Sequence, residues 1–342
     1  MKFIPSPVLR PSERDIFFKS MPSVKRDVLV NSGLAILGRS LGFLVPFLIA
    51  ASYGTSRETD AFFLAWGIIL LIQMILASAY ETALVPFIAE GRSRGRDIGA
   101  FVGSVLGRTT LSLSFFLVVL IVVARPLMAH IAHFDPGTVR DAVRFLLLLC
   151  PMVFFIAWTS VLNGALNASK AFAITALSPA FRSIVVILGI LCLKDILGIY
   201  ALVLGFGLGE FIRFTVSTTR FRQKIGRLRF DWASDDSMGL FFKGAFVQTV
   251  GFALLSSLSL LNQAMASWMG PGELSLYTYG ERLRNIPLLI FSFGVVPVVF
   301  SQWASATSQT GGRSTWPRQR RAIWKLTLAA FALSFIFFAL RM

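Results

Sequence analysis

The sequence is poor in charged side chains, in cysteine and in histidine. Only 15% of its 342 residues are charged, and the mean hydropathy is +0.72, whereas about a quarter of the residues in a typical soluble domain are charged. The two cysteines, Cys150 and Cys192, lie in apolar runs and indicate neither a disulfide framework nor a metal site. The two histidines lack metal-ligand partners at helical spacing, and the sequence shows no paired catalytic carboxylates. We therefore predict a protein that is not an enzyme and needs no cofactor.

Long apolar runs make up most of the sequence. About nine of them approach the roughly 20 residues that a helix needs to cross a bilayer. They cover residues 28–51, 61–87, 98–124, 143–166, 171–193, 197–216, 244–268, 274–301 and 322–340. This pattern predicts an all-α polytopic membrane protein of about nine transmembrane helices. We expect a tail at 1–27, a six-helix lobe at 28–216, a basic linker at 217–243 and an incomplete second lobe of about three helices at 244–342.

Basic residues concentrate in alternate loops between these runs. The net charge of +16 is spread over short loops, so it indicates membrane topology rather than a nucleic-acid partner. One set of loops holds most of the Lys and Arg, and the other set holds only Arg57, Arg125, Arg140 and Lys194. Because cytoplasmic loops are enriched in Lys and Arg, we predict a multi-pass protein with a cytoplasmic N-terminus.

An internal repeat relates the first two runs to the seventh and eighth. Six crossings separate the copies, so both copies enter the membrane from the same side. Such parallel repeats are typical of transporters whose substrate site lies between two lobes. The matching stretches are 51–54 with 266–270, 61–66 with 276–279, and 83–87 with 295–300. Three other glycine spacings, Gly38/Gly42, Gly103/Gly107 and Gly205/Gly209, predict close helix packing.

Several charged residues fall inside the apolar runs. Arg39 lies near the middle of the first run, where a charge costs at least about 2.5–3.5 kcal/mol. Two interpretations remain open: these arginines line a cationic cavity for an anion, or they pair with acids and hold helices together. Because the planar fork of arginine suits phosphate, the first interpretation favours a diphosphate headgroup. We take as candidate substrate-binding residues Arg39, Asp60, Arg182, Glu281, Arg282 and Arg284. Arg213 lies closer to a helix end, and we expect it to snorkel to the membrane surface.

Five short strings together resemble the MurJ/MviN family of lipid-linked oligosaccharide flippases, which belongs to the same superfamily as O-antigen and multidrug exporters. The strings are Leu37-Gly38-Arg39-Ser40-Leu41-Gly42-Phe43, Thr59-Asp60-Ala61-Phe62-Phe63, Ala83-Leu84-Val85-Pro86, Asn163-Gly164-Ala165-Leu166-Asn167 and Tyr279-Gly280-Glu281-Arg282-Leu283. The resemblance covers about residues 28–303.

This resemblance implies a flippase for an undecaprenyl-diphosphate-linked cell-wall precursor, lipid II in the type case, in the bacterial inner membrane. It implies two six-helix lobes around a cationic cavity with alternating access. The implied partners are the lipid-linked oligosaccharide diphosphate, membrane lipids and cell-wall synthesis proteins. By position, Arg39, Asp60 and Arg282 correspond to residues important in the family cavity, and Glu281 corresponds to an adjacent acid.

The chain also departs from the family pattern. Val45 stands where the family usually has a basic residue, and Ile72-Gln73-Met74 stands where it usually has a pair of arginines. Arg182 is our candidate for a partial replacement of that charge. The family normally has about fourteen helices, so we expect a C-terminally truncated form. A flippase for a lipid-linked exopolysaccharide or O-antigen, and a non-transporting truncated product, remain as alternatives.

Overall fold

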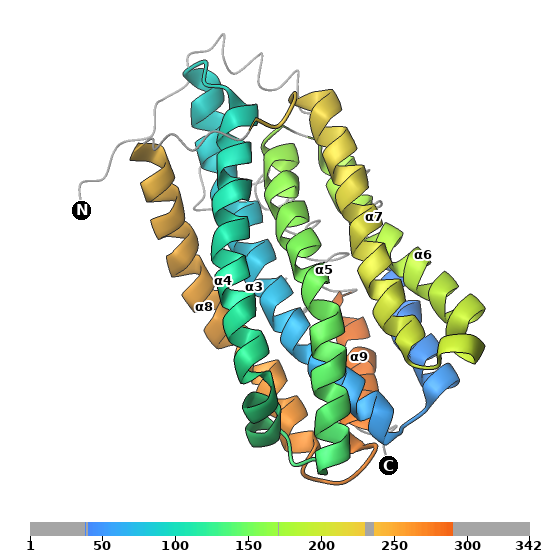
Figure 1. Ribbon diagram of the computed structural model, residues 1–342. Helices are drawn as coiled ribbons and strands as arrows, with labels where there is room; N and C mark the ends of the chain where they lie inside the picture. The colour runs from blue at the N-terminus through green and yellow to red at the C-terminus, as the bar shows by residue number, and fades with distance from the viewer. Residues whose placement is uncertain (1–37, 39, 170, 230–235, 290–342) are drawn as a thin grey trace, which may run out of the picture. The chain divides into compact units, whose positions relative to one another are not determined.

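The computed structural model describes residues 38, 40–169, 171–229 and 236–289, and every regular element in these ranges is an α-helix (Figure 1). A short apolar helix, Ser40–Tyr53, comes first. The labelled helices are α3 (Arg57–Ser93), α4 (Ile98–Ile131), α5 (Pro136–Ala168), α6 (Phe172–Leu197), α7 (Tyr200–Lys224), α8 (Asp236–Ala266) and α9 (Glu273–Leu289). By length and composition, six helices within the described ranges could cross a membrane.

The predicted all-α membrane class is thus confirmed. The predicted tail, the first part of the 28–51 run, the end of the 274–301 run and the whole 322–340 run lie outside the described residues. The number of nine crossings therefore stays a prediction.

Side-chain caps begin three of the long helices. The Ser56 hydroxyl accepts a hydrogen bond from the Thr59 amide before α3, and the Asp97 carboxylate accepts one from Ala100 before α4. Asp135 caps α5, where Pro136 occupies the first helical position. These residues satisfy amides that a helix cannot satisfy internally at its N-terminus. The sequence therefore sets where α3, α4 and α5 begin after their short loops.

Successive helices run in opposite directions, so their loops collect at two ends. Hydrogen bonds between loops show which loops share an end: Tyr53 Oη donates to the Gly198 carbonyl at 3.1 Å, and the His133 amide donates to Ser267 Oγ at 3.1 Å. We name this the Ser56 end, with loops 54–56, 132–135, 198–199 and 267–272.

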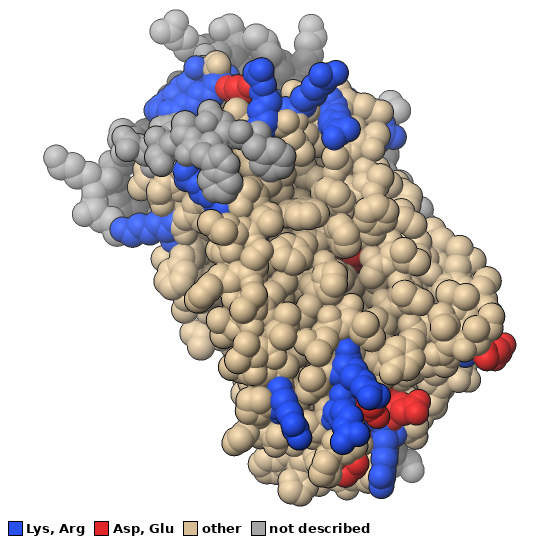
Figure 2. Space-filling view, viewed as in Figure 1, with Lys and Arg blue, Asp and Glu red and all other residues tan. Residues whose placement is uncertain are grey.

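The opposite end is named the Arg94 end. There Arg92 Nη2 donates to Ser169 Oγ at 2.9 Å, and the loops include 94–97 and 225–229. The described loops alternate between the two ends as the positions of the basic residues predict. Figure 2 shows Lys and Arg gathered toward the ends of the helices, with a band of mostly uncharged side chains between them. Such a band suits contact with lipid tails.

The chain divides by its contacts into one compact unit that ends at Tyr279 and a second unit that begins at Gly280. In the first unit, α3 packs against α5 and α8, and α7 packs against α5 and α6. Aromatic rings fill the core toward the Ser56 end, where the rings of Trp66 and Phe206 lie 4.0 Å apart. A second cluster surrounds the buried Phe241 of α8. The predicted lobe boundaries at 28–216 and 244–342 rest on the apolar runs and not on these contacts, so they stay predictions.

Glycines bring the backbones of α6 and α7 together, as the Gly205/Gly209 spacing predicts. A Cβ on Gly205 would lie 3.1 Å from Val186 Cα, and a Cβ on Gly209 would lie 3.0 Å from Arg182 Cα. Both distances are tighter than ordinary van der Waals contact, so a side chain at either position would push the helices apart. This close approach fixes the place of Arg182 beside the backbone of α7.

Candidate functional site

Asp60, in the first turn of α3, is buried and accepts hydrogen bonds on both carboxylate oxygens. Its Oδ2 accepts from the Gly272 amide at 2.5 Å, and its Oδ1 accepts from the Ser275 amide at 2.8 Å and the Ser275 hydroxyl at 2.5 Å. Only 1% of Asp60 is exposed. Because these amides precede and begin α9, the carboxylate acts as an external cap on the positive end of that helix.

Further contacts surround this cap at the Ser56 end. Tyr279 Oη donates to the Gly54 carbonyl at 2.9 Å, and the rings of Phe63 and Tyr279 lie edge to face with centroids 5.4 Å apart. We name Gly54, Asp60, Gly272, Ser275 and Tyr279 the Asp60 clasp. The clasp joins the two stretches that the sequence repeat relates. In this structure, Asp60 therefore links the two copies of the repeat.

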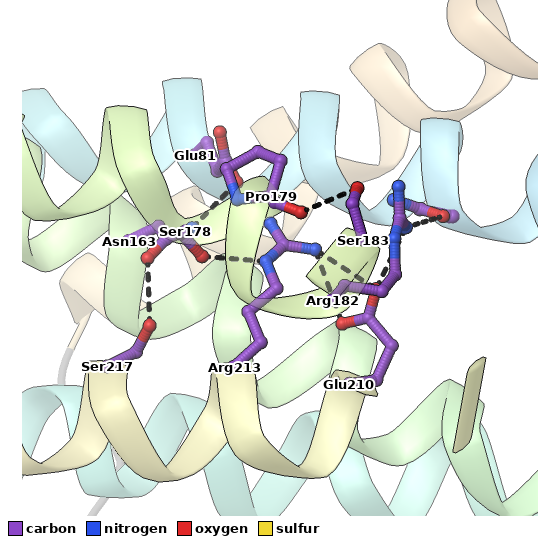
Figure 3. Close-up of polar contacts among 10 residues, drawn as sticks. Glu81, Asn163, Ser178, Pro179, Arg182, Ser183, Glu210, Arg213 and Ser217 are labelled. Atoms are coloured by element: carbon purple, nitrogen blue, oxygen red, sulfur yellow. Dashed lines mark hydrogen bonds and ion pairs between the residues drawn. The ribbon is translucent and has the colours of Figure 1, made fainter. Parts of the chain in front are cut away.

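Arg182 lies near the middle of α6 and forms hydrogen bonds with two other helices. Its Nη1 donates to Glu210 Oε1 of α7 at 2.9 Å and to Gln73 Oε1 of α3 at 3.2 Å. The Arg182 side chain is 19% exposed, whereas Glu210 is completely buried. Figure 3 shows the charged groups of Arg182, Glu210 and Arg213 pointing toward one another between the helices. We name these three residues the Glu210 cluster.

The expectation for Arg213 is wrong. This arginine is 7% exposed and does not snorkel to the surface. Its Nη1 contacts both carboxylate oxygens of Glu210 at 3.2 and 3.3 Å, and its Nε donates to Ser178 Oγ of α6 at 2.7 Å. The reason is a competing partner: a buried carboxylate one helical turn away attracts the guanidinium more strongly than a distant membrane surface.

Sequence reasoning missed Glu210 altogether. The signal was present, because an acidic residue inside the apolar run 197–216 is a functional or pairing residue by default. A smaller polar group lies beside the cluster in Figure 3. There Asn163 Nδ2 donates to Glu81 Oε1 at 3.4 Å, and Ser217 Oγ donates to Asn163 Oδ1 at 3.3 Å. The polar interior of the first unit is therefore larger than the sequence indicates.

The remaining candidates belong to α9 beyond Tyr279 or lie outside the described residues. In the second unit, Arg284 Nη2 lies 3.6 Å from Glu281 Oε1, and the Arg284 side chain is 65% exposed. Arg282 is half-buried. Arg39 lies outside the described residues. The structure thus brings Arg182 to Glu210 and Asp60 to α9, while a shared site for Arg39 and Arg282 stays a prediction.

Comparison with known proteins identifies relatives of the chain. The family model described as "Lipid II flippase MurJ" matches residues 49–341. The "Lipid II flippase MurJ" of Burkholderia cenocepacia is 26% identical over 294 residues, which cover 82% of this chain and 57% of that protein. The "Probable lipid II flippase MurJ" of Buchnera aphidicola subsp. Acyrthosiphon pisum is 26% identical over 295 residues, which cover 79% and 55%. The chain therefore spans a little more than half the length of these curated relatives.

Solved structures show the same fold. A structure described as "Lipid II flippase MurJ, inward closed conformation" superposes with a TM-score of 0.71 at 22% identity and covers 84% of this chain and 60% of that chain. An inward-facing multidrug resistance MATE transporter superposes with a TM-score of 0.58 at 15% identity, covering 85% and 66%. The chain therefore shares the helical fold of these two structures.

Proposed function

Because the chain belongs to the MurJ family of lipid II flippases, we propose that it forms the first lobe and the beginning of the second lobe of a flippase, not of an enzyme. The cargo is an undecaprenyl-diphosphate-linked cell-wall precursor, either lipid II or a related lipid-linked glycan. The match of one family model to residues 49–341 carries this proposal, because it spans most of the chain.

In the proposed mechanism, arginines hold the diphosphate while the lipid tails remain in the bilayer. Moving a multiply charged headgroup through hydrocarbon unaided is prohibitively costly, so positive side chains must replace its water. Arg39 and Arg282 are the primary contacts, and Arg182 contributes a third positive group. Glu281 and Arg284 adjust the charge around Arg282.

The Asp60 clasp supports alternating access. Its hydrogen bonds join the two copies of the repeat at the Ser56 end, so a path at that end requires them to break. All of its donors are amides or hydroxyls, which water can replace. We therefore propose that the clasp closes one side of the transport path and opens in the other state of the cycle.

The proposed location is the bacterial inner membrane with the N-terminus and the Arg94 end in the cytoplasm. The support is the excess of Lys and Arg in the loops of that end. Labelling of intact cells with an impermeant thiol reagent tests this orientation in a Cys150→Ala/Cys192→Ala background. A cysteine at position 140 should react and one at position 94 should not; the reverse pattern contradicts the orientation.

Growth of cells depleted of their own flippase tests the function. The test protein joins this chain to the remaining C-terminal part of the Burkholderia cenocepacia relative, which supplies the portion of the family length that the chain does not span. We expect this chimera to restore growth and the Arg39→Ala and Arg282→Ala variants to abolish it at equal protein levels. The matched control is Arg144→Ala, an exposed arginine that pairs with Asp141 at 3.6 Å. Normal growth with both cavity arginines replaced would rule out the mechanism.

A further inference from the structure

The two arginines of the Glu210 cluster are held in different ways. Arg213 is enclosed between α6 and α7: its Nε is bound by Ser178, its Nη1 contacts both oxygens of Glu210, and its side chain is 9% exposed. Arg182 connects α6 to two other helices, because its Nη1 contacts Glu210 of α7 and Gln73 of α3. Its side chain is 19% exposed. Packing of α6 against α7 accounts for Arg213 but not for the reach of Arg182 toward α3.

Two arginines of the cluster share one acid. The guanidiniums of Arg182 and Arg213 both contact the Glu210 carboxylate near the middle of α6 and α7. Each buried charge has a desolvation cost, and one arginine would be enough to neutralise Glu210. A second guanidinium on one carboxylate at this depth of a membrane protein makes Arg182 a candidate functional residue.

The direction of Arg182 is fixed by its surroundings. The backbone of α7 at Gly209 leaves no room for a Cβ beside Arg182, so the start of this side chain cannot shift toward α7. Farther along the side chain, Nη1 of the guanidinium donates to both Glu210 Oε1 of α7 and Gln73 Oε1 of α3. A binding group held by packing and by neighbouring hydrogen bonds needs no reorganisation when its ligand arrives.

Resting on the function proposed above, we propose that Glu210 is a positioning residue that holds the Arg182 guanidinium toward α3, where Arg182 contacts a phosphate of the lipid-linked substrate. Arg213 serves the packing of α6 on α7 and does not contact the substrate. The Glu210 carboxylate therefore has two roles. It neutralises Arg213 permanently, and it orients Arg182 for binding.

Lipid binding to the purified 342-residue chain tests this assignment. The probes are a polyprenyl diphosphate and the polyprenyl alcohol of the same length, and the measured quantity is the ratio of their dissociation constants. Arg182→Gln should reduce the preference for the diphosphate by about tenfold or more, because charge-assisted hydrogen bonds are lost. Arg182→Lys should give an intermediate ratio, since it keeps the charge without the planar fork.

Arg213→Gln is the matched control. Each single arginine variant leaves one arginine paired with Glu210, so both should fold, and their melting temperatures report whether they do. Arg213→Gln should keep the diphosphate preference of the parent chain. Glu210→Gln should reduce the preference although both arginines remain, and Glu210→Asp should restore part of it.

The outcomes separate this inference from the proposed function. A parent chain that shows no preference for the diphosphate contradicts both. A clear preference in the parent that survives Arg182→Gln overturns the role of Arg182 alone. An equal loss in Arg182→Gln and Arg213→Gln, with both variants folded, assigns the cluster a purely structural role and overturns the positioning assignment.

Discussion

Asp60 and Glu210, the two deeply buried carboxylates among the described residues of the first unit, have surroundings that are opposite in character. Asp60 is bound by backbone amides and a hydroxyl at the N-terminus of α9. Glu210 is bound by two guanidiniums in the middle of the helices. The Asp60 clasp thus joins the two stretches of the repeat with neutral donors, whereas the Glu210 cluster joins α6 and α7, which lie between those stretches in the chain, with full charges.

This difference indicates which contact can open during a transport cycle. Separation of the Asp60 clasp exposes amides and a carboxylate at the end of the helices, where water can replace the lost bonds. Separation of the Glu210 cluster would leave guanidiniums and a carboxylate without partners in a low-dielectric interior, which costs several kcal/mol for each ion. The clasp is suited to movement, and the cluster is suited to hold α6 and α7 together throughout.

Removal of the Glu210 carboxylate should produce the largest effect. Glu210→Leu leaves two buried guanidiniums without their counter-ion, and we expect it to lower the free energy of unfolding by about 3–5 kcal/mol. Steric-trapping measurements in lipid bicelles would determine this loss. The control is the triple variant with Leu at 182, 210 and 213, which removes all three charges and should recover much of the stability. A loss below about 1 kcal/mol in Glu210→Leu would contradict the permanent role of the cluster.

Removal of the Asp60 carboxylate should have a smaller and more local effect. Asp60→Ala deprives Gly272 and Ser275 of their acceptor, and the cost expected for a lost helix cap is about 1–2 kcal/mol. Hydrogen exchange should therefore accelerate in residues 270–279 and remain unchanged in residues 182–213. Ser275→Ala provides a graded control, since it removes only the hydroxyl donor. Faster exchange throughout the first unit would show that the clasp is part of the permanent core.

The smallest effect is expected at Asp135, the exposed cap of α5 at the same end as the clasp. The side-chain hydrogen bond from Thr138, and then its amide, lower the pKa of Asp135 below the usual value. A lowered carboxyl pKa adds stability above the unfolded-state pKa of about 3.9, and that stability is lost as the pH falls through the folded-state value. Hydrogen exchange at the start of α5 should therefore be slower at pH 6 than at pH 3 after correction for intrinsic rates. This difference should shrink in Asp135→Asn; an equal difference in both proteins would contradict the cap.

The sequence predicts the helices far better than it predicts their contacts. Apolar runs, capping residues and the Gly205/Gly209 spacing act locally, so each indicates its own element. The repeat and the family resemblance identify Asp60 as important, but its partners are 212 and 215 residues away in the chain. Which helix its carboxylate caps is decided by the three-dimensional packing.

For the Glu210 cluster, the sequence contains the information, but it is missed when each residue is considered alone. The sequence alone indicates a cavity residue for Arg182 and a surface-seeking residue for Arg213, each considered by itself. Their shared acid determines the position of both. A rule that searches for an acid whenever two basic residues fall in neighbouring apolar runs would have found Glu210 without a structure.

The amount of lipid-linked precursor on the outer face of the membrane shows whether the arginines hold the diphosphate during transport. Cells depleted of their own flippase would carry the chimera described above, and an impermeant enzyme added from outside would cleave the precursor that has crossed. We expect cleaved precursor with the parent chimera, none with Arg282→Ala, and an intermediate amount with Arg182→Gln. Equal cleavage in all three, at equal protein levels, would contradict transport by arginines that hold the diphosphate.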